Sequence, residues 1–161
     1  MAGALSDRLF CIYIVPRYDL ECVSSSRITD RQYRALAAFR YRIRHFLAFS
    51  EEAARRSGLT PQQHQLLLAI RACSEPASIG DLAGVLLLRH HSVVGLVDRL
   101  EALGYVQRTR DTHDRRLVHV GLTPQGARLL ADLSAAHRHE LRDNGPELVS
   151  ALDALLSDST L

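Results

Sequence analysis

The apolar pattern of the chain changes period abruptly after Gly104. Before this residue, apolar side chains recur every three or four positions, which is typical of amphipathic helices. Over 105–110 and 117–122 they alternate every two positions, which is typical of half-buried strands, and the polar stretch 111–116 joins the two. The sequence therefore predicts one β-hairpin inside an otherwise helical chain, which excludes all-β folds and plain helical bundles.

Capping signals divide the helical parts of the chain. A Ser or Thr shortly before a stretch with apolar residues at helical spacing is typical of an N-cap, and such residues are Thr29, Thr60, Ser78 and Thr123. Gly58 and Gly104 are candidate helix ends. A further helix is expected over about 89–103. The Asn-Gly-Pro triplet at 144–146 predicts a break, after which a last amphipathic helix should follow.

Length and composition fit one domain, or one domain with an appendage, because the chain has 161 residues. Hydrophobic residues make up 47% and charged residues 24%, so wholesale disorder is excluded. No apolar run approaches the roughly 20 residues that a membrane-spanning helix needs. Residues 1–28 do not share the helical pattern. Two interpretations of them stay open: an arm of uncertain order, or an over-long start of the reading frame.

The cysteines point to a reducing compartment. Cys11, Cys22 and Cys73 are odd in number, and their spacing matches no zinc-binding pattern. The short apolar stretch 9–15 is not followed by a small-residue cleavage site, so no secretory signal is expected. We therefore expect a cytoplasmic protein without a structural metal or a cofactor.

Polar residues gather where the second of two short helices should begin, just before the hairpin. Two short helices and a charged hairpin make a winged helix-turn-helix, in which one helix enters the major groove of DNA and the hairpin reaches the minor groove. The alternative for the helix start alone is an ordinary solvated helix end. The candidate DNA-contacting residues outside the hairpin tip are Ser78, Arg89, His90, His91, Ser92, Gly95, Arg99 and Arg110.

Cationic residues also gather at the expected hairpin tip, namely His113, Arg115 and Arg116. An arginine at such a tip can enter the narrow, electronegative minor groove. Asp114 in the tip and Asp98 on the preceding helix are candidates for holding a neighbouring arginine through a bidentate pair. The alternative is a solvated charged turn.

The same region resembles the multiple-antibiotic-resistance regulator (MarR) family. The resemblance is carried by Asp-Arg-Leu-Glu-Ala-Leu-Gly at 98–104, Asp-Thr-His-Asp-Arg-Arg at 111–116 and Leu-Thr-Pro-Gln-Gly at 122–126. Residues 60–63 and 78–83 are similar to the starts of that family's second and third helices, and the resemblance covers about 29–156.

The resemblance implies a homodimeric bacterial transcription regulator, mostly α with a small β-hairpin wing, that binds double-stranded DNA. Helices at about 29–57 and 124–156 would intertwine between two copies, leaving 157–161 as a tail. A winged lobe at about 60–122 would read each half-site of a pseudopalindromic operator. The residues alone also favour a dimer, because the apolar faces of the terminal helices exceed what a small lobe can cover.

The resemblance further implies pairing of the wing residues Asp114 and Arg116 with nearby charges, Asp98 among them. It also implies a small aromatic or anionic effector, since many similar regulators bind such molecules between the dimer helices and the winged lobe. For each residue expected in that crevice the alternative is plain: an exposed cation, a core aromatic ring or a residue of a helix start. These residues are Arg40, Arg44, His45, Phe49, His64 and Arg71.

The sequence gives less support to other functions. Some relatives of the family sense thiol oxidation near the start of the first long helix, where this chain has no cysteine. The pairs His90-His91 and His137-x-His139 do not place two rings on one helix face, so a metal sensor is not expected. No phosphate loop, zinc-protease motif or nucleophile elbow is present, so we expect no enzyme. Two alternatives stay open: a winged module that binds protein instead of DNA, and a regulator that responds to thiol oxidation.

Overall fold

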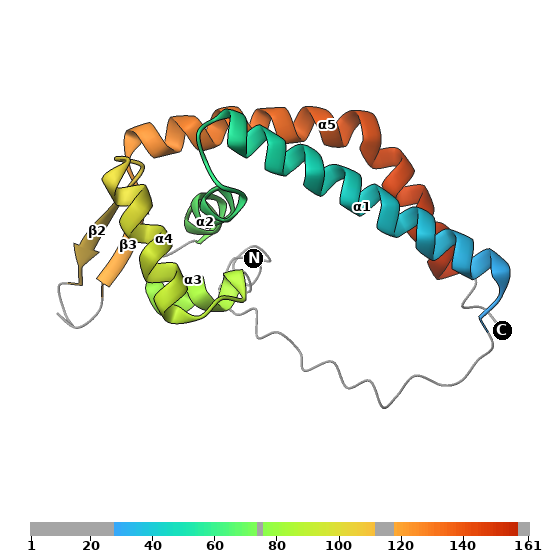
Figure 1. The fold of residues 1–161 in the computed structure, drawn as a ribbon, viewed down its shortest axis with the longest axis horizontal. Helices are drawn as coiled ribbons and strands as arrows, with labels where there is room; N and C mark the ends of the chain where they lie inside the picture. Colours follow the sequence, from blue (N-terminus) through green and yellow to red (C-terminus); the bar gives the residue numbers. More distant parts are fainter. Residues whose placement is uncertain (1–27, 74–75, 112–117, 158–161) are drawn as a thin grey trace, which may run out of the picture.

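The computed structural model describes residues 28–73, 76–111 and 118–157. Two long helices, α1 and α5, lie side by side and antiparallel, and the shorter elements gather beneath one end of this pair (Figure 1). The elements are α1 (Asp30–Arg56), α2 (Pro61–Ala72), β1 (Ala77–Ser78), α3 (Ile79–Leu86), α4 (His90–Ala102), β2 (Val106–Arg110), β3 (Val118–Leu122) and α5 (Pro124–Leu156). The mostly α fold with a β-hairpin is confirmed.

The helices begin where the capping residues predict. The side chains of Thr29, Thr60 and Ser78 accept a hydrogen bond from the backbone of the third helical residue, and each forms a complete capping box. Thr123 accepts from the backbone N–H of Gly126 at 3.1 Å. At the other end, α4 is followed by Gly104 in the left-handed region, with φ of 74°. These local signals therefore set most of the element boundaries.

A three-stranded antiparallel sheet has the order β1-β3-β2. Val120 at the centre of β3 lies opposite Ala77 of β1 and Arg108 of β2. Sequence reasoning missed β1, because two residues are too few to show an alternating pattern. Through this strand the chain between α2 and α3 is joined to the hairpin.

The hydrophobic core lies in the lobe beneath the long helices. The largest fully buried side chains come from α2, α3, α4 and the sheet: Leu66, Leu67, Leu82, Val93, Val97, Leu100, Val106 and Val120. In contrast, α1 contributes Ala54 to the buried set, and α5 contributes Leu130 and Leu133. The outer parts of the two long helices consequently retain many exposed apolar side chains.

The predicted break at 144–146 is wrong, because α5 continues through it as one helix to Leu156. Proline has no N–H to donate and costs a helix interior about 3 kcal/mol, so packing must compensate. The second half of α5 lies against α1, and Arg42 of α1 pairs with Glu147, directly after Pro146. Figure 1 shows α5 changing direction part-way along, as expected for a helix with an internal proline. No helix among the described residues is long and apolar enough to span a membrane.

Candidate nucleic-acid interface

A helix-turn-helix is formed by α3 and α4. Leu87, in the turn between them, adopts the left-handed conformation with φ of 55° and ψ of 36°. The backbone N–H of Leu88 then donates to the carbonyl of Ala83 at 3.0 Å, which closes the end of α3. Buried residues of α4, including Val93 and Leu100, anchor its inner face in the core. The opposite face of α4 is left toward solvent.

That outer face carries the residues predicted from the sequence. Arg89 is the N-cap of α4, and its side chain makes no capping hydrogen bond. The first backbone N–H groups of α4 are therefore not bound by the side chain of the N-cap residue. His90, His91 and Arg99 are exposed, whereas Ser92 and Gly95 are half-buried. A Cβ added at Gly95 would meet only the guanidinium of Arg99, at 3.7 Å, so packing does not require glycine there.

The two strands of the hairpin stand next to α4. Arg110, at the end of β2, is exposed. Ser78 is half-buried, and its hydroxyl donates to Asp81 at 2.7 Å within the capping box, so it serves the start of α3. The tip residues His113, Asp114, Arg115 and Arg116 lie outside the described residues, and their expected roles stay predictions.

Arg108 on β2 ties the hairpin to α4, a role that sequence reasoning missed. Its Nη2 donates to Asp98 at 2.5 Å, its Nη1 donates to Glu101, and its backbone N–H donates to Glu101 at 3.1 Å. The available signal was the spacing of Asp98 and Glu101, which places two carboxylates on one face of α4. Asp98 pairs with Arg108 in the strand, and its expected role toward the arginines of the hairpin tip stays a prediction.

Opposing effects act on the pKa of Arg108. Burial alone would lower it, but hydrogen bonds and charges from Asp98 and Glu101 outweigh burial and raise the pKa above its usual value. The guanidinium is therefore a permanent cation held between two carboxylates. Because one carboxylate lies a turn from the other, the contact fixes the angle of β2 against α4.

The six predicted effector residues do not meet in one crevice. Phe49 and His64 both contact the ring of His137 on α5, with centroids 5.6 Å and 4.8 Å away. His45 is exposed and lies 3.7 Å from Glu140. Arg40 and Arg44 are exposed on α1. Arg71 lines a separate cavity near the sheet.

His64 and His137 form a pair of tilted, contacting rings where α1, α2 and α5 meet. His137 donates from Nδ1 to the carbonyl of Leu133 at 2.6 Å, and its Nε2 lies 2.8 Å from the hydroxyl of Ser50. His64 is 5% exposed. Burial, and secondarily the charge of His137, lower the pKa of His64 below its ordinary value.

This burial predicts that acid destabilises the protein. When the pH falls below about 6.5, His64 takes up a proton in the unfolded chain before it does so in the folded one, so unfolding becomes more favourable. The free energy of unfolding should continue to fall until the pH passes the lowered pKa of His64 in the folded state. His64→Gln should reduce the difference between the urea midpoints measured at pH 7.5 and 5.5. His90 is exposed and makes no hydrogen bond or ion pair among the described residues, so His90→Gln is the control and should leave that difference unchanged.

Among the described residues there is no cluster of three metal-ligating side chains. Cys73 is half-buried and is not in a disulfide. Cys11 and Cys22 lie outside the described residues, so thiol sensing by them stays untested.

The helix-turn-helix followed by an antiparallel hairpin makes this a winged helix-turn-helix protein. A family model described as "MarR family" matches residues 57–117. A curated relative, the HTH-type transcriptional regulator YsmB of Bacillus subtilis (strain 168), is 27% identical over 120 residues, which are 72% of this chain and 82% of that protein. The family model and this relative both support the MarR family of transcription regulators for this chain.

Solved structures show the same fold. A MepR variant of Staphylococcus aureus bound to an oligodeoxyribonucleotide has a TM-score of 0.63 at 20% identity and covers 80% of this chain and 98% of that chain. AbsC, a MarR family transcriptional regulator from Streptomyces coelicolor, has a TM-score of 0.65 at 21% identity and covers 82% and 93%.

Proposed function

We propose that the protein is a homodimeric repressor that binds a pseudopalindromic DNA operator and responds to a small aromatic or anionic effector. The observation that carries this proposal is the outer face of α4. It presents Arg89, His90, His91 and Arg99 to solvent beside a hairpin that Arg108 fixes in place. A basic, polar helix start of this kind suits the major groove. The oligonucleotide bound to the MepR variant supports the same assignment by likeness of fold.

The dimer is supported by apolar side chains that the lobe does not cover. Exposed large hydrophobic residues on α1 and α5 are Tyr33, Leu36, Tyr41, Leu47, Leu141, Val149, Leu152 and Leu156. Soluble monomers rarely expose so many apolar side chains on neighbouring helices. A second copy related by a two-fold axis would cover them and would set the distance between the two α4 helices.

Val149 provides a mild test of the dimer. Val149→Thr keeps the shape of the side chain but places a hydroxyl in the proposed interface of both copies, so the dimer should dissociate about fivefold more readily, roughly 1 kcal/mol. Sedimentation at several concentrations measures this change. Leu68 on α2 is 49% exposed but lies in the lobe, so Leu68→Gln should leave the dimer unchanged. Equal dissociation of all three proteins would exclude this face of α5 from the interface.

The salt dependence of duplex binding tests DNA recognition. The affinity should fall linearly with salt on logarithmic axes, because bound phosphates release counterions, whereas a protein-binding module would show no duplex affinity to lose. Replacing Arg115 and Arg116 with Ala should weaken binding and lower the slope by about one unit for each phosphate that the tip no longer binds.

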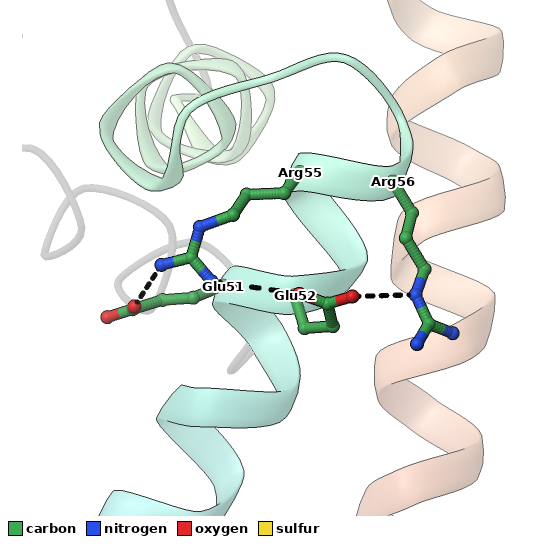
Figure 2. Close-up of polar contacts among 4 residues, drawn as sticks. All are labelled: Glu51, Glu52, Arg55 and Arg56. Carbon is green, nitrogen blue, oxygen red and sulfur yellow. Dashed lines mark hydrogen bonds and ion pairs between the residues drawn. The ribbon is translucent and has the colours of Figure 1, made fainter.

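Arg55 and Arg56 offer a control with the same change in net charge. Figure 2 shows both reaching back along α1 to Glu51 and Glu52, with Arg55 2.9 Å from Glu51 and Arg56 2.9 Å from Glu52. Their charges are already compensated on the surface of α1. Replacing both with Ala should therefore leave the slope unchanged. A tip variant that binds like this control would remove the hairpin tip from the mechanism.

A further inference from the structure

A side-chain contact joins the two strands of the hairpin beyond their outermost described backbone pair. That pair is Arg110 with Val118, and Asp111 follows directly after β2. The Nε2 atom of His119, the second residue of β3, lies 2.9 Å from a carboxylate oxygen of Asp111. The hydrogen bond between these two side chains therefore continues the pairing of the strands to the point where the hairpin tip begins.

Strand geometry explains why these two side chains meet. His119 lies opposite Thr109, and successive side chains of a strand point to alternate faces, so Asp111 shares the face of Thr109. The contact is thus a diagonal pair, two residues removed from the direct partner, which a side chain as long as histidine can reach. Arg108, which pairs with carboxylates of α4, lies on the other face. Arg108 and His119 consequently act on opposite faces of the hairpin.

The surroundings of the His119 ring favour one tautomer. The side chains of His119 and Asp111 are 22% and 26% exposed, so their hydrogen bond is largely shielded from water. Nδ1 of His119 is buried and has no hydrogen-bond partner among the described residues. In the neutral ring, a proton on Nδ1 would be a buried donor without an acceptor, whereas a proton on Nε2 is donated to the carboxylate. We therefore expect the proton on Nε2.

We propose that His119 is a positioning residue for DNA binding, which holds the end of β2 through Asp111 and so sets the direction in which the hairpin tip leaves the sheet. The inference rests on the proposed function, because the tip carries Arg115 and Arg116, the cations expected to bind DNA. A tip that starts in a fixed direction loses less conformational freedom on binding. His119 itself would contact no DNA, since its Nδ1 is buried and its Nε2 is bound to Asp111.

Nitrogen NMR of the full-length protein with isotope-labelled histidine tests the pair without DNA. At pH 7.5 His119 should show a protonated Nε2 and an unprotonated Nδ1, and Asp111→Ala should reduce this preference because the acceptor is lost. The signals of this ring are identified by their absence from His119→Leu. A proton on Nδ1, or a preference that is unchanged in Asp111→Ala, would overturn the proposal.

Fluorescence anisotropy tests the positioning role, with a duplex that the purified protein has selected from random sequences. His119→Leu should weaken binding about tenfold with an unchanged slope against salt, because no phosphate contact is lost. His119→Gln, whose amide N–H can take the place of Nε2, should recover most of the affinity. His139→Leu is the matched control. It removes a comparable contact, 3.1 Å from His139 to Asp143 on the exposed surface of α5, and should bind like the wild type.

The same contact can be removed from the carboxylate side. In a protein that already carries Asp111→Ala, His119→Leu should have no further effect, because the two residues act through one hydrogen bond. A further tenfold loss there, or a lowered salt slope for His119→Leu alone, would overturn the proposal. If the wild-type protein binds no duplex, the proposed function and the positioning role both fail. If it binds and His119→Leu binds equally well, only the positioning role fails.

Discussion

Gly126→Ala is expected to destabilise the protein by about 3 kcal/mol, a large effect for one added methyl group. A Cβ at this position would lie 2.0 Å from the carbonyl oxygen of Tyr105 and 2.8 Å from its carbonyl carbon. Both are backbone atoms, so rotation of a side chain cannot relieve the steric clash. Thr123 fixes the same contact from its other side, because its N–H donates to the carbonyl of Tyr105 at 3.0 Å and its hydroxyl donates to that of Gly104 at 2.6 Å.

Urea unfolding monitored by circular dichroism measures the change. Gly84→Ala is the matched control: Gly84 also lies inside a helix, but a Cβ there would meet nothing within 4 Å. Since alanine is the better helix former, this control should gain about 0.5–1 kcal/mol. If the two variants were equally stable, the close approach of α5 to the residue before β2 would be absent in solution.

The second large effect is expected in DNA affinity. Arg108→Met removes the two side-chain contacts that hold β2 against α4, and it leaves the carboxylates of Asp98 and Glu101 uncompensated. We expect operator binding to weaken roughly thirtyfold, about 2 kcal/mol, because the hairpin loses its fixed angle. Arg108→Lys should recover only part of this loss, since an ammonium cannot pair with two carboxylates as a planar fork does. Fluorescence anisotropy with labelled operator gives both affinities.

The salt dependence distinguishes a positioning role from direct contact. Arg108 faces carboxylates instead of phosphates, so Arg108→Met should weaken binding while the slope against salt stays the same. Arg110→Met, on the same strand, removes an exposed cation and should lower the slope by about one unit. A lower slope for Arg108→Met would show that its guanidinium contacts phosphate, and the positioning role would be wrong.

Local signals in the sequence were sufficient for most of the fold. Thr60 and Ser78 cap helices because their neighbours complete the capping boxes, and Gly104 ends α4 because only glycine adopts its conformation cheaply. The Asn-Gly-Pro triplet failed as a predictor for the opposite reason. There, contacts with α1, which are remote in sequence, outweigh the local preference of Pro146.

The site was predictable in part for the same reason. The outer face of α4 follows from helical spacing, so its exposed residues could be anticipated. The partner of Asp98 depends on how β2 crosses α4, and no sequence pattern states that angle. Likewise, Arg71 and His64 are on the same helix but have different surroundings, because the end of α2 borders the sheet and the start of α5, whereas its beginning lies against His137 further along α5. The position of each residue in the fold decides which neighbour it contacts.

A single residue, Thr123, separates the last strand of the wing from the 33-residue helix α5. Because this connection is so short and Tyr105 packs closely against Gly126, β3 and α5 rotate together. At 1.5 Å per residue the part of α5 before Pro146 extends about 33 Å, so a tilt of roughly 5° at the wing moves its far end by about 3 Å. Conversely, a small displacement of the distant end of α5 rotates the hairpin by only a small angle.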